Sequence, residues 1–161
     1  MTGTTDPLGN STYIEYSNHN KPTKVTFPTK GILSLAYDDY GNLTAVVDPI
    51  GRKTALVNND KGYVTELILP DLSQSSVEYD ERGSITAITD SFDVKTTYEY
   101  DALNRVVKTT NGEGAVTMFE YNVSNSITKV TNAAGTTRSY GYNLAGKVTR
   151  ITDFDGGIVE L

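Results

Sequence analysis

The sequence lacks several residue types on which common functional sites depend. It has no cysteine and no tryptophan, and its one histidine is His19. The absence of cysteine excludes disulfides, thiolate metal ligands and a cysteine nucleophile. His19 has no second histidine with which to form a metal pair, and no Gly-x-Ser-x-Gly motif marks a serine nucleophile. We therefore predict no catalytic residue, no metal site, no cofactor and no enzymatic activity.

Charge and hydropathy set further limits. The formal net charge is −6, and acidic residues are spread along the chain without a basic patch that could neutralise phosphates. We therefore expect no nucleic-acid partner. No apolar run approaches membrane-spanning length. The segment Met1–Thr5 has neither the basic region nor the apolar core of a signal peptide. We expect no membrane insertion by this segment.

The sequence does contain a repeat with a period of 21 residues, composed mainly of residues that favour strands and turns. Each unit reads as turn, strand, turn, strand, which is a β-hairpin with its connections. We predict a single repeat array over residues 1–161, with a partial unit at 1–15 and a truncated final unit at 142–161. Both ends interrupt a unit, so we expect a segment of a longer array. The units start at Tyr16, Tyr37, Asn58, Tyr79, Tyr100, Tyr121 and Tyr142.

The first turn of each unit follows the tyrosine and has the pattern Tyr-Asp-x-x-Gly or a near variant. Glycine and asparagine adopt positive φ most readily, and an Asp or Asn three residues earlier can bond back to the turn amides. The pattern predicts a three-residue hairpin loop with a left-handed last residue. The left-handed positions are Asn20, Gly41, Gly62, Gly83, Asn104, Asn125 and Gly146, and the Asp or Asn positions are Asp38, Asp80, Asp101, Asn122 and Asn143.

The second turn of each unit repeats this logic with the pattern Asp-Pro-x-Gly, as in Asp48, Pro49 and Gly51. Proline at the first central position fixes the φ that this turn requires. Related second turns begin at Asp6, Asn111, Asn132 and Asp153, and those of the last two end on Gly135 and Gly156. In contrast, the segments 27–30 and 69–72 depart from this pattern, and the segment 16–20 departs from that of the first turn, so we expect altered turns at all three.

The first strand of each unit carries two apolar residues three positions apart, such as Leu43 and Val46. In a regular strand this spacing places the two side chains on opposite faces. Because side chains alternate between the two faces, equivalent residues 21 positions apart would lie on opposite faces. Each unit therefore needs an irregularity that returns equivalent residues to the same face. A β-bulge between the paired positions meets both needs. We predict bulges around Thr44, Thr65, Thr86, Thr128 and Thr149.

The second strand of each unit alternates more simply. Thr96, Tyr98 and Tyr100 share one face, which is aromatic and aliphatic, while the other face is mostly threonine and charged residues. We predict that the repeated tyrosines are packing residues of the apolar face and that the aspartates cap turns. The predicted structural turn and packing positions include Tyr37, Tyr79, Tyr100, Tyr121 and Tyr142. The fold class is all-β: an array of antiparallel hairpins forming a curved or spiralling sheet.

The segments Tyr37–Leu43, Tyr79–Ile85 and Tyr100–Val106, with the intervening Asp-Pro-x-Gly turns, resemble the YD repeats of the Rhs family. The resemblance covers essentially the whole chain. It implies a segment of a hollow shell made from strips of hairpins, as in bacterial polymorphic toxins, the C component of Tc toxins, and teneurins. It further implies neighbouring repeats and an enclosed toxin or effector domain as partners, and a secreted or cell-surface parent protein. The sequence shows no core segment, autoproteolysis region or toxin domain after the repeats.

Two further expectations concern binding. A repeat module for carbohydrates or cell surfaces is the alternative function, because such modules also stack aromatic-rich hairpins of similar length. The absence of tryptophan disfavours it, and Tyr40, Tyr63, Phe92 and Phe154 are scattered instead of paired. The acidic turns do not have the spacing of known calcium loops. Finally, unpaired sheet edges and the apolar face predict self-association.

Overall fold

The structure is a computed structural model that describes residues 1–161, and every regular element in it is a β-strand. No helix is present that is long and apolar enough to cross a membrane. The strands are β1 (Thr2–Thr5), β2 (Ser11–Tyr16), β3 (Pro22–Thr26), β4 (Ile32–Tyr37), β5 (Leu43–Val47), β6 (Lys53–Asn58), β7 (Val64–Ile68), β8 (Gln74–Tyr79), β9 (Ile85–Thr89), β10 (Lys95–Tyr100), β11 (Val106–Thr110), β12 (Val116–Tyr121), β13 (Ile127–Thr131), β14 (Thr137–Tyr142), β15 (Val148–Thr152) and β16 (Ile158–Glu160).

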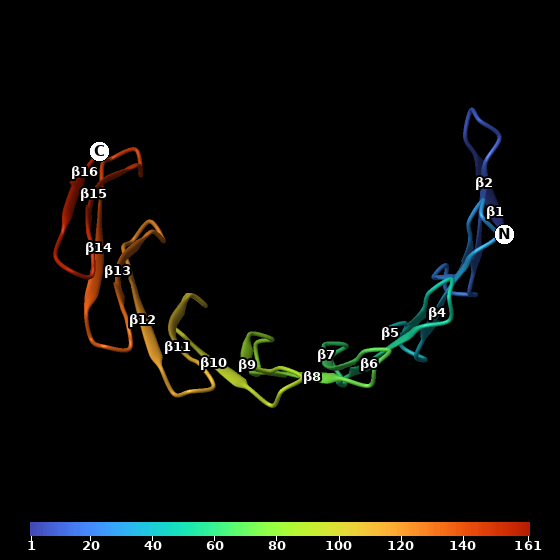
Figure 1. Cartoon of the computed structure of the whole chain (residues 1–161), viewed down its shortest axis with the longest axis horizontal. Coiled ribbons are helices and arrows are strands. Elements are labelled where there is room, and N and C mark those ends of the chain that lie inside the picture. The colour runs from blue at the N-terminus through green and yellow to red at the C-terminus, as the bar shows by residue number, and fades with distance from the viewer. The chain divides into compact units, whose positions relative to one another are not determined.

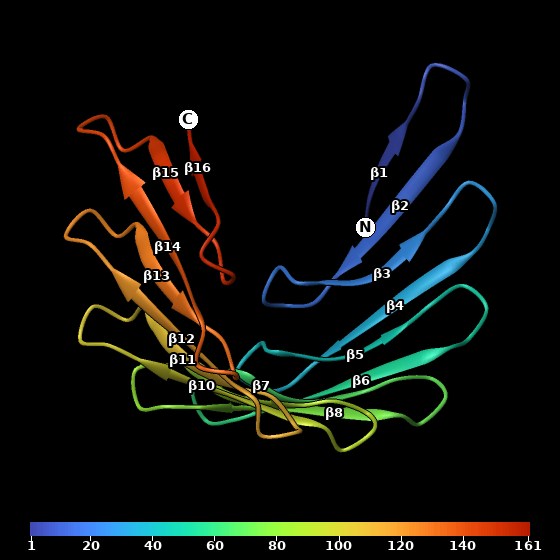
Figure 2. The ribbon, with the colours of Figure 1, turned by 60° about the vertical axis from the view of Figure 1, so that its left-hand side comes forward.

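The 16 strands form one sheet whose spatial order follows the chain order from β1 to β16. Neighbouring strands pair antiparallel as successive hairpins (Figure 1). The chain divides into two compact units, Met1–Val77 and Glu78–Leu161. In each unit the loops lie at the two ends of the strands (Figure 2). The first turns therefore line one edge and the second turns line the opposite edge, because hairpin connections alternate between strand ends.

All 15 connecting turns share one hydrogen-bond pattern. In the turn after Tyr37, the Gly41 amide donates to the Asp38 carbonyl over 3.0 Å, and the Asp38 amide donates to the Asn42 carbonyl over 3.0 Å. Gly41 is left-handed, with φ of 85°. This is the three-residue loop with a left-handed last residue that the sequence predicts. The same left-handed position is held by asparagine at Asn20, Asn104 and Asn125.

The expectation of altered turns at 16–20, 27–30 and 69–72 is wrong. All three keep the common hydrogen bonds: the Asn20 amide donates to the Ser17 carbonyl over 3.1 Å, and the Lys30 and Leu72 amides donate to the Phe27 and Leu69 carbonyls over 2.9 Å each. Lys30 and Leu72 therefore adopt φ of 65° and 67°, although neither residue favours this region. The regular ladders on both sides of each turn fix the chain ends, so strand pairing overrides the local preference.

A bulge lies where the odd period requires it. Ala36 pairs with Ala45 and Tyr37 pairs with Leu43, so Thr44 is the extra residue on β5. This register shift recurs wherever a first turn joins two strands of known register, which confirms the predicted bulges at Thr44, Thr65, Thr128 and Thr149. Leu43 and Val46 consequently face the same side of the sheet. Two further shifts, at Thr23 and Val107, follow the same rule.

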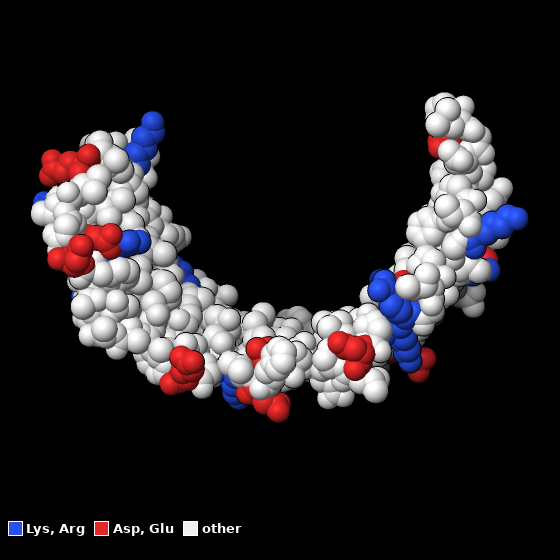
Figure 3. Space-filling view, in the orientation of Figure 1, with Lys and Arg blue, Asp and Glu red and all other residues white.

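The register defines two faces, which we call the apolar face and the mixed face. Leu35 pairs with Val46, and Leu56 pairs with Leu67, on the apolar face. The mixed face carries cross-strand ion pairs between Glu and Lys in several hairpins. Their N–O distances are 2.9 Å for Lys24–Glu15, 2.7 Å for Lys108–Glu99 and 2.9 Å for Lys129–Glu120. In the view of Figure 3, charges of both signs are scattered over the surface.

The sheet has almost no buried core. Ala87 is the one buried apolar residue, with 2% of its surface exposed, and Ser84 is the one buried polar residue. The side chains of both faces are otherwise half-buried or exposed. Tyrosines of the repeat follow this rule, since Tyr37 and Tyr100 are half-buried and Tyr16 is exposed. The single layer therefore leaves its apolar face uncovered over its length.

Candidate functional site: the row of first turns

Each first turn is capped by a side chain that accepts two backbone hydrogen bonds. In the turn after Tyr79, Asp80 Oδ1 accepts from the amides of Arg82 and Ser84 over 2.9 and 2.8 Å. The bond from the Ser84 amide is the main reason why the pKa of Asp80 lies below its usual value. Asp38 accepts the equivalent pair and its pKa is also lowered, chiefly by the side-chain amide of Asn42. These aspartates hold the shape of the turn.

The repeated tyrosines connect each hairpin to the one before it. The hydroxyl of Tyr37 donates to the carbonyl of Pro22 over 2.9 Å, and the hydroxyl of Tyr100 donates to that of Ile85 over 2.7 Å. In these bonds the acceptor lies 15 residues earlier, at the first residue of the strand that follows a first turn. Tyr121 and Tyr142 make the same bond to Val106 and Ile127, and the amide of Asn58 reaches Leu43 in the same way. The tyrosine is therefore a link between repeats as well as a packing residue.

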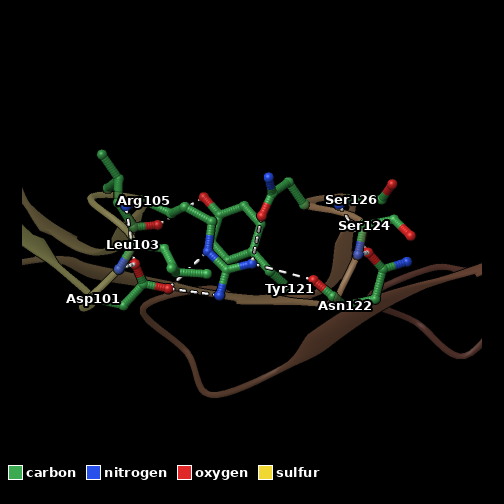
Figure 4. Close-up of polar contacts among 9 residues, drawn as sticks. Asp101, Leu103, Arg105, Tyr121, Asn122, Ser124 and Ser126 are labelled. Atoms are coloured by element: carbon green, nitrogen blue, oxygen red, sulfur yellow. Dashed lines mark hydrogen bonds and ion pairs between the residues drawn. The ribbon is translucent and has the colours of Figure 1, made fainter.

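Arg105 makes the densest set of contacts between two first turns (Figure 4). Its Nε donates to Asp101 Oδ2 over 2.7 Å within its own turn. Its Nη1 donates to the Asn122 carbonyl and to Asn125 Oδ1 of the next turn, over 3.1 Å each. The guanidinium also lies 4.6 Å from the ring centroid of Tyr121, in cation–π geometry. One side chain thus ties two successive turns together.

The position after the left-handed residue reaches the next turn at other repeats as well. Ser84 Oγ donates to Asn104 Oδ1 over 2.5 Å. Asn42 lies against Gly62, where an added Cβ would come within 2.6 Å of Asn42 Oδ1. Gly62 therefore serves two needs, since it also has φ of 80°. Side chains therefore link the three successive first turns that begin at Asp80, Asp101 and Asn122.

Shallow grooves open between neighbouring first turns. One of about 630 Å³ lies beside Asp80 and Tyr100, and another of about 380 Å³ lies beside Ser17 and Tyr37. Neither contains a nucleophile paired with a base. Ser17 Oγ accepts from the amides of His19 and Lys21, so it is a turn cap. No group of three or more His, Asp or Glu side chains is placed to hold a metal ion.

A second polar cluster lies at the last second turn. Arg138 stands on the apolar face opposite Val130, and its Nε and Nη2 donate to Asp153 Oδ1 over 2.9 and 2.8 Å. The guanidinium also lies 5.0 Å from the ring centroid of Phe154. The Phe154 amide and Arg138 lower the pKa of Asp153. Asp153 therefore does not cap its turn as the other aspartates do. The Gly157 amide instead donates to Asp155 Oδ1.

The structure places the predicted turn residues in turns and brings them together in two rows, one at each edge. Sequence reasoning missed the tyrosine hydroxyl bonds and the bridging role of Arg105. The sequence does show that each repeated tyrosine lies 15 residues after the start of an earlier predicted strand. However, the spacing alone does not show that the ring lies across a neighbouring hairpin. The contact depends on the side-by-side placement of repeats.

The sequence matches the family described as RHS Repeat over residues 79–116 and 121–158. No curated protein matches it. Solved structures of Tc toxin components match the fold. A TcdB2-TccC3 complex without its hypervariable C-terminal region matches 88% of this chain with a TM-score of 0.70 and 16% identity.

Two further structures agree. The Photorhabdus luminescens Tc holotoxin pore with a TccC3 point variant matches 94% of this chain, with a TM-score of 0.62 and 13% identity. A TcdB2-TccC3-TEV structure matches 98%, with a TM-score of 0.62 and 12% identity. The chain spans only 9% to 12% of the length of these solved chains. At these identities the likeness establishes the fold.

Proposed function

Because the chain belongs to the Rhs/YD-repeat family, we propose that this structural repeat segment is part of the wall of a hollow shell that encloses or presents a toxin or effector domain. The observation that carries the proposal is the uncovered single-layer sheet, in which Ala87 is the one buried apolar residue. A sheet with one apolar face gains stability only when that face is covered. Neighbouring repeats of a longer shell and an enclosed domain would cover it.

The proposed wall has no catalytic activity of its own. Its polar side chains are engaged in turn caps and cross-links, as the bonds of Asp101 and Arg105 illustrate. The roles we assign to the repeated Tyr, Asp and Gly positions are structural. We further propose that the repeat units of this longer shell start, in this chain, at Tyr16, Tyr37, Asn58, Tyr79, Tyr100, Tyr121 and Tyr142. The parent protein is proposed to be secreted or exposed at the cell surface.

The 161-residue polypeptide is also proposed to self-associate. Its edge strands β1 and β16 are only 4 and 3 residues long, so they offer few unpaired backbone groups. The apolar face is the larger adhesive surface, because aliphatic side chains such as Leu35 and Leu67 remain partly exposed across it. Light scattering over a concentration series measures this association, and a strictly monomeric profile at high concentration would count against it.

Containment is tested in the full parent chain by protease protection of the segment that follows the repeats. Val46 and Val47 are neighbours in β5, but Val46 lies on the apolar face and Val47 on the mixed face. We expect Val46→Asp to expose the downstream segment to cleavage, because a charge on the covered face disrupts packing. Val47→Asp is the matched control and should leave protection intact. Equal protection in both folded variants would contradict the proposal.

A further inference from the structure

The second turn at 69–72 departs from the common pattern in two ways, which among the second turns only the turn at 27–30 shares. Its capping position holds Leu69, whose side chain cannot accept the amide bonds that Asp48 accepts in the preceding second turn. Its left-handed position holds Leu72, with φ of 67° and 78% of its surface exposed. Strained and exposed apolar residues without a structural benefit point to function. Glycine holds this position in five other second turns, at Gly9, Gly51, Gly114, Gly135 and Gly156, while Lys30 and Asp93 hold it in the remaining two. Leu72 is the one large apolar residue among them.

These leucines form one wall of a groove at the second-turn edge of the first unit. The groove has a volume of about 570 Å³, within the roughly 300–1,000 Å³ of concave sites that hold small ligands. Its floor is apolar, while cationic side chains stand at its rim. Arg52 is paired with Asp48 over 2.6 Å, and Lys53 is exposed. The lining residues are Gly51, Arg52, Lys53, Ala55, Ile68, Leu69, Pro70 and Leu72.

A complementary shape occurs at the opposite edge. The first turn at 38–41 presents Tyr40, whose surface is 92% exposed, beside the exposed carboxylate of Asp39. The cap made by Asp38, which accepts from the Tyr40 amide over 3.0 Å, fixes the backbone of this tip. Among the first turns, no other tip places an aromatic side chain next to a carboxylate. A rigid aromatic ring with an adjacent anion fits an apolar groove with a cationic rim.

The tip and the groove cannot meet within one strip of hairpins. First turns and second turns lie at opposite ends of strands that are 5 or 6 residues long, which separates them by about 17 Å at roughly 3.3 Å per residue. A first-turn tip that enters this groove must therefore belong to a second strip. Because groove and tip are different surfaces, such a contact joins copies edge to edge in a heterologous manner.

We propose that the groove beside Leu72 binds the Asp39–Tyr40 tip of a second copy of this chain. Tyr40 enters between Leu69, Pro70 and Leu72, and the Asp39 carboxylate pairs with Lys53 at the rim. This inference rests on the proposed wall function. It adds a specific contact to the general self-association proposed above.

The test uses two variants that each remove one half of the contact. Tyr40→Ser removes the tip and Leu72→Gly removes one wall of the groove while relieving the left-handed strain. Sedimentation velocity should show at least about tenfold weaker association for each variant alone, as expected when a central aromatic or apolar anchor is lost. An equimolar mixture should form dimers, because the first variant keeps its groove and the second keeps its tip.

Lys30→Gly is the matched control for Leu72→Gly. It relieves the same strain in the other uncapped second turn, where φ is 65°, and we expect no change in association. A charge exchange adds a second arm: Asp39→Lys and Lys53→Glu should each weaken association, and their mixture should restore it.

Three results would overturn the contact. If Tyr40→Ser and Leu72→Gly associate as the unchanged protein does, association runs through the apolar face and the tip does not enter the groove. If their mixture shows no dimer, the two surfaces do not complement each other. If the unchanged protein is monomeric at high concentration, the contact is absent. The protease test of containment is independent of all three, so failure of either inference is distinguishable.

Discussion

Within residues 78–161 the turn caps change from carboxylates to amides. Asp80, Asp90 and Asp101 cap three successive turns, and Asn111, Asn122, Asn132 and Asn143 cap the next four. The geometry is the same in both regions. Asp80 Oδ1 accepts over 2.9 and 2.8 Å, and Asn122 Oδ1 accepts over 2.9 Å twice. The hairpin thus requires an accepting oxygen at this position and does not require a charge.

What the carboxylate adds is a dependence on pH and a second bonding partner. The pKa of Asp101 lies below its usual value, chiefly because of the bond from the Arg105 amide. Asp101 also anchors the Arg105 side chain through Oδ2, which an amide cap such as Asn143 does not do. The two regions therefore share a fold but should respond differently to substitution and to acid. The predictions below test that difference.

The largest expected effect comes from removing a cap in each region. Asn143→Ala deprives two backbone amides of their acceptor, for which a loss of about 1 kcal/mol is typical. Asp101→Ala should lower the urea midpoint further, because it also frees Arg105 from one of its two turns. Urea unfolding followed by circular dichroism measures both. Equal midpoints for the two variants would show that the Arg105 link contributes nothing.

The next largest expected effect is that acid destabilises the aspartate-capped turns more than the asparagine-capped turns. The folded pKa of Asp80 and that of Asp101 lie below the usual 3.8. Their contribution to stability is therefore present above about pH 3.8 and is lost as the pH falls through the folded values. Hydrogen exchange over a descending pH series should show opening of the turns at 80–84 and 101–105 before those at 111–147, after correction for intrinsic rates. Simultaneous opening would contradict this order.

The left-handed positions offer a smaller, paired test. Asp93, in an aspartate-capped turn, has φ of 60°, and Gly114, in an asparagine-capped turn, has φ of 81°. Asp93→Gly should stabilise the protein and Gly114→Ala should destabilise it, each by up to about 1 kcal/mol, because glycine adopts this region with less strain than aspartate or alanine. Thermal unfolding measures both. A change of the same sign in both variants would refute the argument.

The smallest expected effect at neutral pH is that of exchanging the cap types. Asp80→Asn keeps the accepting oxygen, so its stability at pH 7 should change by less than about 0.5 kcal/mol. The acid response of the 80–84 turn should nevertheless disappear. Asn122→Asp is the reciprocal control and should introduce an acid response in the 122–126 turn. Exchange measurements at low pH distinguish these outcomes from a general loss of stability.

Much of the fold could be predicted because the same pattern of turn and strand residues recurs in every repeat. Turn positions follow from the spacing of residues that tolerate positive φ, and the bulge at Thr44 follows from the odd period. The turn at 69–72 was mispredicted because residue preference was weighed without the flanking ladders, which fix its ends. Similarly, the bond from Tyr100 to Ile85 joins residues of different hairpins. No local pattern shows it, because it depends on how repeats lie side by side.

The bulge has a consequence for how such a chain can change its length. Residues that pair across a second turn are both odd-numbered or both even-numbered, such as Ala45 and Ala55, so each face keeps either odd or even numbers there. The bulge at Thr44 exchanges the faces of odd-numbered and even-numbered residues, once in each 21-residue unit. A duplication or deletion of one whole unit therefore returns every later side chain to its proper face. Without the bulge, only an even number of units could be gained or lost. A single extra residue makes the single repeat a heritable unit of growth.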